Sequence, residues 1–424
     1  MCALTEPKRL LVLTDRPFLQ TGYATIMNNI LNYLTTKGWE CHSLSHGYKG
    51  QTLVPGTQVS NGMKLNFWIH GSSIEPYAKE LLEYYIKTIK PDIFLILLDT
   101  FMLYPWLLDK DLSPSLPVFY FPSDGGEGLP TGCDKILKKM SRAVAMSKFG
   151  QKQVLQYHGI KADYIPHAVE TSNYFPLPQA KRDEIKAVSG LAGKFVVGCV
   201  ARNQPRKQMD RTLKAFKRFA QGKDDVVLLL HTDPYDAARN FDMKTKIQQW
   251  GIQNKVLFTG MHWWNGFDYK KMNDVYNVMD VFFMLTTGEG FGVPIIEAQA
   301  AGIPQVVTDY TTTQELVLED GQSGLGVRLV DCAEDEWNAL DKWDLKQIDS
   351  YLNDVGGTVT GGYEVERGLA SIRHAAEQLE KLYRHKELRE QFAQAGVEKV
   401  KKLYNWDLVI EQWHKLFTEM VEKR

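Results

Sequence analysis

The densest chemical signal in the 424-residue sequence is a run of three glycines and two carboxylates between positions 288 and 297. The glycines are Gly288, Gly290 and Gly292, and the carboxylates are Glu289 and Glu297. Glycines let a backbone approach a ligand closely, and amides at the start of a helix suit a phosphate. Carboxylates accept hydrogen bonds from paired hydroxyls, so Glu289 could reach a sugar and Glu297 a ribose diol. Taken alone, the glycines fit an ordinary Gly-rich turn equally well, and they lack the spacing of the Rossmann dinucleotide fingerprint.

The elements that must position this loop are a strand before it and a helix after it. Residues 281–285 are apolar and predict the strand, and the run from about 293 predicts the helix. Such pairs recur along the whole chain, which predicts βαβ units and parallel sheets. The further predicted strands are 10–14, 92–98, 118–121, 143–146, 195–200, 226–231, 256–259 and 305–308, and the clearest predicted helices are 24–37 and 208–220.

The alternation lapses once, over residues 174–193, where prolines and a charged stretch predict a linker followed by an outer helix. We therefore expect an α/β protein with two doubly wound domains, residues 1–178 and 179–404. Ligands of such sheets bind at the carboxyl ends of the strands. Residues 364–402 are charged and of helical period, and a last amphipathic helix follows residue 404.

Composition excludes several classes of protein. The formal net charge is −1, with 44% hydrophobic and 24% charged residues, which argues against a disordered chain and against sequence-blind binding to nucleic acid. The five cysteines form no CxxC pair, so a zinc site or a disulfide framework is not expected, and free thiols fit a reducing cytosol. The apolar runs near the N-terminus and at 93–98 are too short for a signal peptide or a membrane span. Peripheral membrane contact is left open.

The segment from Glu289 to Glu297 closely resembles the Glu-x7-Glu signature of the retaining glycosyltransferases of family 4. The match continues through Gly302, Pro304 and residues 306–309 and 315–317, about thirty residues in all. The resemblance implies the GT-B fold: two Rossmann-like domains that face a central cleft, with a C-terminal helix, here 405–424, that crosses back to the N-terminal domain. The donor would lie mostly on the second domain and the acceptor on the first.

The resemblance also implies roles for single residues. Glu289 would hold the donor sugar and Glu297 the ribose, while the loop would contact the diphosphate and the sugar. The loop residues with that role are Gly290, Phe291, Gly292 and Val293.

A second segment, 197–207, resembles the family's basic pair after the first strand of the second domain. It assigns Arg202 and Lys207 to the donor diphosphate, where two fixed cations would stabilise the leaving group. The alternative is a solvated charge run, and Arg206 is predicted to be a bystander. Met261 and His262 follow a strand end that resembles the nucleobase site, although a structural role for His262 fits as well.

The first domain matches more loosely. Gly22 lies where family members place a glycine loop that meets the donor, but this chain has one glycine where many relatives have two. The loop 122–127 takes the place of a segment that often supplies a histidine near the reacting sugar. It contains none, so Asp124 is the substitute candidate, for a donor hydroxyl or for orienting the acceptor. A turn-capping aspartate before Gly-Gly is the alternative.

The sequence thus predicts a retaining hexosyltransferase that moves a sugar from a nucleoside-diphosphate-sugar to an acceptor hydroxyl on a glycan, a lipid-linked sugar or another molecule. The resemblance implies neither a metal nor another cofactor. We expect a cytoplasmic protein, at most peripheral at the inner membrane face. A non-catalytic sugar-nucleotide binding protein and a transferase acting on a modified nucleic-acid base are the alternatives. The sugar, the nucleobase, the acceptor, the oligomeric state and the role of the segment 331–362 stay open.

Overall fold

A computed structural model describes residues 7–19, 21–58, 64–72, 77–239, 241–261, 266–330, 358–360 and 365–424. Two compact units emerge from the contacts within the chain. The first comprises 1–123, 127–167 and 406–424, and the second 124–126 and 168–405. The chain therefore returns to the first unit with its last helix, α15 (Trp406–Glu422).

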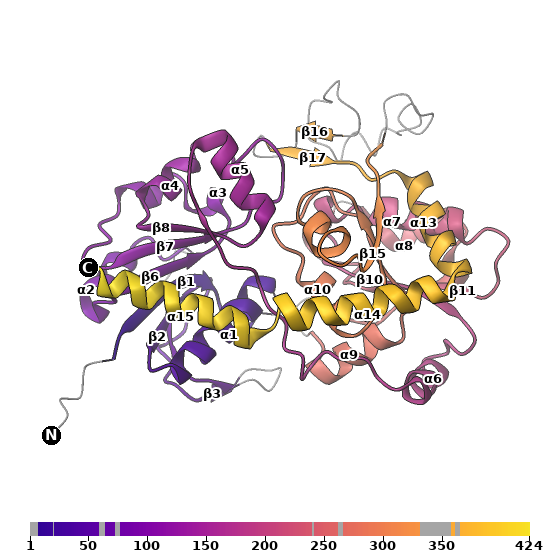
Figure 1. The fold of residues 1–424 in the computed structure, drawn as a ribbon, viewed down its shortest axis with the longest axis horizontal. Helices are drawn as coiled ribbons and strands as arrows, with labels where there is room; N and C mark the ends of the chain where they lie inside the picture. Colours follow the sequence, from indigo (N-terminus) through magenta and orange to yellow (C-terminus); the bar gives the residue numbers. More distant parts are fainter. Residues whose placement is uncertain are drawn as a thin grey trace. The chain divides into compact units, whose positions relative to one another are not determined.

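The first unit is built on a seven-stranded parallel sheet (Figure 1). Its strands lie in the order β5-β2-β1-β6-β7-β8-β9, which is the order of a doubly wound sheet. All five residues of β6 are buried, as expected of a parallel strand covered on both faces. The strand bounds are β1 (Arg9–Asp15), β2 (Glu40–His46), β5 (Trp68–Gly71), β6 (Ile93–Leu97), β7 (Leu116–Phe121), β8 (Arg142–Ala145) and β9 (Asp163–Tyr164), with a side hairpin of β3 (Thr57–Gln58) and β4 (Lys64–Leu65).

Helices connect these strands and pack on the sheet. α1 begins where the Thr21 hydroxyl accepts a hydrogen bond from the amide of Ala24, at 3.2 Å. α15 packs against α1 and buries Trp413, whose ring contacts that of Tyr120 edge-on. The helices of this unit are α1 (Gly22–Thr36), α2 (Leu82–Ile89), α3 (Thr100–Leu103), η1 (Trp106–Asp109), α4 (Asp134–Lys139), α5 (Lys148–His158) and α15.

The second unit contains a six-stranded parallel sheet in the order β12-β11-β10-β13-β14-β15. Its first strand in the chain, β10, lies between β11 and β13, so the direction of winding reverses between β10 and β13. A ligand is expected at the carboxyl ends of the strands at such a point. The bounds are β10 (Phe195–Val200), β11 (Val226–His231), β12 (Val256–Phe258), β13 (Val281–Met284), β14 (Gln305–Thr308) and β15 (Gly324–Val327).

The helices of the second unit cover this sheet. α13 packs on α7, and α14 packs on α10 (Figure 1). The bounds are α6 (Gln179–Val188), η2 (Pro205–Lys207), α7 (Met209–Phe219), α8 (Met243–Gln249), η3 (Gln253–Lys255), α9 (Tyr269–Asn277), α10 (Val293–Ala300), η4 (Gln314–Leu318), α13 (Ile372–Arg384) and α14 (Lys386–Leu403).

The structure confirms the predicted α/β class with two doubly wound parallel sheets, and it corrects one segment. Residues 364–402 were predicted to be helical throughout, but a short strand, β17 (Glu366–Gly368), precedes the helix and pairs with β16 (Thr358–Thr360). The helix begins only after Ser371, whose hydroxyl accepts from the amide of His374. The charged period marks the helices correctly, but it cannot show that three residues before them take part in backbone pairing. Most of the segment 331–362 lies outside the described residues.

Candidate functional site

The site is centred on Glu289, in the loop that follows β13 at the point where the winding of the second sheet reverses. The Glu289 side chain is almost fully buried, with 3% of the residue exposed. Its Oε1 atom accepts from Lys207 Nζ at 2.6 Å and from Thr286 Oγ1 at 2.8 Å. Arg206 Nη1 lies 2.9 Å from the same oxygen. Two cations from the loop after β10 thus meet one carboxylate from the loop after β13.

Electrostatics keeps this carboxylate ionised. Burial by itself raises the pKa of Glu289, but the charges and hydrogen bonds of Arg206 and Lys207 outweigh it and lower that pKa to about 2. Burial lowers the pKa of Lys207, as does the neighbouring Arg206, while Glu289 opposes both. Two cations and one anion leave net positive charge in the site, which suits a diphosphate.

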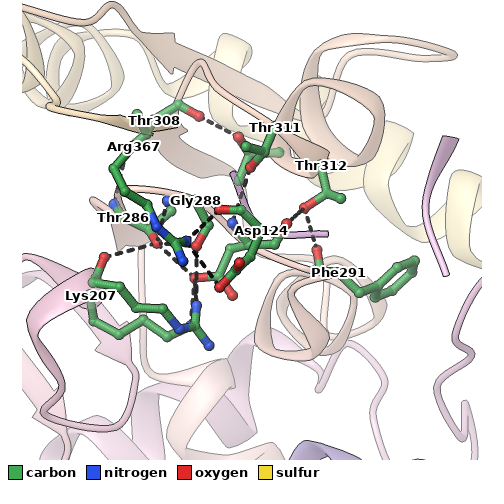
Figure 2. A network of polar contacts seen from close by, with 12 residues as sticks. Asp124, Lys207, Thr286, Gly288, Phe291, Thr308, Thr311, Thr312 and Arg367 are labelled. Carbon is green, nitrogen blue, oxygen red and sulfur yellow. Dashed lines mark hydrogen bonds and ion pairs between the residues drawn. The ribbon is translucent and has the colours of Figure 1, made fainter. Parts of the chain in front are cut away.

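Threonines fix the backbone of the glycine-rich loop (Figure 2). Thr311 Oγ1 accepts from the amide of Glu289 at 3.1 Å, and Thr312 Oγ1 donates to the carbonyls of Glu289 and Phe291, both at 2.9 Å. Gly292 has φ +108°, a conformation that favours glycine, and it caps the start of α10 ahead of Val293. Hydrogen bonds from neighbouring threonines therefore fix the backbone of this loop.

The two members of the predicted basic pair contact different carboxylates. Lys207 donates to the Glu289 carboxylate. Arg202 instead makes two hydrogen bonds with the buried carboxylate of Asp236, at 2.6 and 3.1 Å, and its own side chain is 46% exposed. Arg206, predicted to be a bystander, takes the place beside Glu289 and also donates to the carbonyl of Gly288 at 3.1 Å. The short helix η2 places residues 206 and 207 on adjacent positions facing the same carboxylate.

Glu297 lies in α10, and two tyrosines hold its carboxylate. Tyr276 Oη donates to Glu297 Oε2 at 2.6 Å, and Tyr174 also forms a side-chain hydrogen bond with it. Burial raises the pKa of Glu297, and these hydrogen bonds oppose the rise. Tyr269 packs edge-on against Tyr174. These tyrosines could not be predicted from the sequence, because their contact with Glu297 depends on the packing of the linker and α9 against α10.

Asp124 lies in the short segment 124–126, which belongs to the second unit, although the chain before it (to 123) and after it (from 127) belongs to the first. Arg367, on β17, donates from Nη1 to the Asp124 carbonyl at 2.6 Å and lies 3.0 Å from Asp124 Oδ2. The carbonyl of Asp124 closely approaches Gly288, where a Cβ atom would lie 1.9 Å from it. Figure 2 shows Asp124, Arg367 and Gly288 pointing toward one another beside Thr286 and Lys207. No motif in the sequence points to Arg367.

The remaining residues predicted to bind the donor are Gly22, Met261 and His262. Gly22 opens α1 in the first unit. Met261 follows the end of β12 and is partly buried, and His262 lies outside the described residues. Across the described ranges, no three or more His, Cys, Asp or Glu side chains come together as a candidate metal site. Among those same ranges, no helix combines the length and the apolar character that a membrane span requires.

Comparison with known proteins shows similarity to glycosyltransferases. Residues 181–336 match the family model described as "Glycosyl transferases group 1". The chain is 28% identical over 191 residues to the lipopolysaccharide core biosynthesis mannosyltransferase LpsB of Rhizobium meliloti, covering 44% of this chain and 51% of that protein. It is 27% identical over 196 residues to a GDP-mannose-dependent phosphatidylinositol monomannoside mannosyltransferase of Mycolicibacterium smegmatis, covering 44% and 47%. The chain thus spans about half the length of these curated relatives, or less.

Solved structures extend the similarity to nearly the whole chain. Sucrose-phosphate synthase from Thermosynechococcus elongatus superposes with a TM-score of 0.71 at 13% identity, over 98% of this chain and 100% of that one. HepE of Anabaena, solved with UDP-glucose, superposes with a TM-score of 0.67 at 13% identity, over 97% and 99%. The fold is therefore that of the GT-B glycosyltransferases. Together with the match to the group 1 model, it supports a place in the glycosyltransferase superfamily.

Proposed function

We propose that this protein is a retaining glycosyltransferase of family 4 that moves a hexose-type sugar from a nucleoside-diphosphate-sugar to an acceptor hydroxyl. The observation that carries the proposal is the buried carboxylate of Glu289 between Lys207 and Arg206, at the carboxyl ends of β10 and β13. Binding of a nucleoside diphosphate requires fixed cations, and binding of a sugar requires a group that accepts hydrogen bonds from its hydroxyls. The two cations and the carboxylate of Glu289 supply both at one site.

In the proposed reaction the cations bind the diphosphate and the carboxylates bind hydroxyls. Lys207 and Arg206 neutralise the diphosphate and stabilise the leaving nucleoside diphosphate, so that no metal ion is required. Arg202 is held by Asp236, and we therefore assign the second cation to Arg206. Glu289 binds hydroxyls of the donor sugar, and Glu297 binds the ribose. The leaving phosphate itself accepts the proton of the acceptor hydroxyl in a substitution on the same face of the sugar.

The relatives narrow the substrates to test. A relative is named as GDP-mannose-dependent, and a protein of the same fold was solved with UDP-glucose. We propose a donor of this class and an acceptor that is a glycan or a lipid-linked sugar, as the names of the mannosyltransferases suggest for those proteins. An acceptor carried by a lipid would bring the protein to a membrane surface.

The test is a thermal-shift and calorimetric panel of UDP, GDP, ADP, CDP and dTDP with their common sugars, in the presence of EDTA. We expect stabilisation by one nucleotide family and its loss in Glu297→Ala. Transfer to a glycan or lipid-linked acceptor, followed by NMR of the anomeric proton, then decides between retention and inversion. Binding without transfer to any acceptor would favour a non-catalytic sugar-nucleotide binding protein. No binding by any nucleotide would refute the proposal.

A further inference from the structure

The strand β17 joins two loops of the second unit. On one side, Gly126 and Glu366 exchange backbone hydrogen bonds, at 3.0 and 3.3 Å. On the other side, the amide of Gly368 donates to the carbonyl of Thr287, two residues before Glu289, at 2.9 Å. The Tyr310 hydroxyl strengthens the first contact, because it bonds both Glu366 and the amide of Gly126. This strand therefore fixes residues 124–126 relative to the loop of Glu289.

Arg367 lies in the middle of this strand and contacts two atoms of Asp124, its carbonyl oxygen and Oδ2. Its Nη1 atom is 2.6 Å from the Asp124 carbonyl and 3.0 Å from Oδ2. A guanidinium that contacts both the main chain and the side chain of one residue fixes the rotamer of that side chain. Asp124 Oδ1 has no hydrogen-bond partner in the part of the chain that the structure describes, and the side chain is 35% exposed.

A role of Asp124 as a turn cap does not fit these contacts. The amide of Gly126 donates to the Glu366 carbonyl and to Tyr310, and not to the Asp124 carboxylate. The backbone of Asp124 lies so close to Gly288 that any side chain at 288 would displace it. A partly exposed carboxylate with one oxygen fixed by an arginine and the other without a hydrogen-bond partner among the described residues, beside the loop of Glu289, is suited to accept a hydrogen bond from a hydroxyl.

We propose that Arg367 is a positioning residue that directs Asp124 Oδ1 at a hydroxyl of the donor sugar. The inference rests on the proposed function and deepens it, because it assigns to the sugar a second carboxylate besides Glu289. It also places part of the sugar site in a segment outside residues 181–336, the range that matches the family model. The nucleoside diphosphate itself makes no use of this pair.

The experiment compares each nucleoside diphosphate with its sugar conjugate. Dissociation constants of UDP, UDP-glucose, GDP and GDP-mannose are measured by calorimetry for the wild type, Asp124→Asn and Arg367→Met. We expect the conjugate of the preferred nucleotide to bind more tightly than the nucleotide alone in the wild type. Both variants should lose about tenfold or more of the affinity for the conjugate, as for a lost charged hydrogen bond, while affinity for the bare diphosphate stays the same.

Further variants separate positioning from general stability. The double variant should be no worse than either single one, because Arg367 acts through Asp124. Arg367→Lys keeps the charge on a side chain that lacks the planar guanidinium, so it should recover only part of the loss, and it replaces Arg367→Met in the test if that variant does not fold. Arg384→Met, which removes a 70% exposed arginine from α13, is the matched control and should change nothing.

Three results would overturn the inference alone, and a fourth would also remove the proposed function. Equal losses for bare and conjugated nucleotide would make Arg367 merely structural and would overturn the inference. Unchanged affinity for the conjugate in the variants, or a wild type that does not distinguish conjugate from nucleotide, would also overturn it. A wild type that binds no nucleotide at all would instead remove the proposed function, and this inference with it.

Discussion

Replacing Glu289 by glutamine leaves two cations beside a neutral amide. The fall of the pKa of Glu289 from 4.5 to about 2 corresponds to a preference of about 3 kcal/mol for the ionised carboxylate. Breaking a buried ion pair by removing one partner typically costs about 3–5 kcal/mol. Arg206 is partly exposed and can turn toward water, whereas Lys207 is buried. We therefore expect the free energy of unfolding to fall by about 3 kcal/mol.

Urea unfolding measures this loss as a lower midpoint at constant slope. Glu377→Gln, which breaks an exposed i,i+4 pair with Arg373, is the control and should cost about 0.5 kcal/mol or less. Adding Lys207→Met to Glu289→Gln should restore part of the stability, because the uncompensated buried charge is then gone. A loss for Glu289→Gln as small as that of the control would refute the electrostatic account of the site.

Glu289→Gln should also change the binding of a nucleoside diphosphate. In the wild type, a diphosphate competes with Glu289 for Lys207 and Arg206. Without the carboxylate, the cations are available, so Glu289→Gln should bind the bare nucleoside diphosphate at least as tightly as the wild type, while sugar transfer is lost. Calorimetry with the nucleotide identified in the panel tests this, and clearly weaker binding would contradict it.

Tyr276→Phe removes the hydroxyl that donates to the Glu297 carboxylate. It should weaken nucleotide binding by about 1 kcal/mol and reduce the preference for a ribonucleotide over the 2′-deoxyribonucleotide. Calorimetry with both diphosphates measures this preference, and an unchanged ratio would count against the assignment of Glu297 to the ribose. Burial lowers the pKa of His167 to about 3, so its imidazole stays neutral in the folded chain while the unfolded chain takes up a proton below pH 6.5. The free energy of unfolding should fall by up to about 1.4 kcal/mol per pH unit as the pH drops from 6.5 toward 3. Urea unfolding at a series of pH values measures this dependence, and an equally steep dependence in His167→Gln would show that His167 is not its cause. Trp413→Ala, in the core of the first unit against Tyr120, should cost about 3–5 kcal/mol by chemical denaturation, and a change below 1 kcal/mol would show that α15 contributes little.

The fold and the centre of the site follow from local sequence patterns. Apolar runs such as residues 93–97 and 195–200 predict the buried strands that the structure has there, and glycines after a strand mark the loop of Glu289. The sequence could not show which arginine lies beside Glu289, because Arg202 pairs with Asp236, which is thirty-four residues away in the chain. Arg367 was hidden for a similar reason: its partner, Asp124, is 243 residues distant.

The contacts of Glu289 with two cations explain how one carboxylate can serve both the stability of the site and the proposed reaction. Glu289 is the counter-ion that makes two neighbouring cations tolerable in a buried place. A bare diphosphate would take over the cations and leave Glu289 buried without a partner, which is unfavourable. A diphosphate that carries a sugar supplies hydroxyls to the released carboxylate in the same step. On the proposed function, the ion triad therefore couples recognition of phosphate to recognition of sugar, and removing Glu289 should narrow the difference in affinity between a nucleotide and its sugar conjugate.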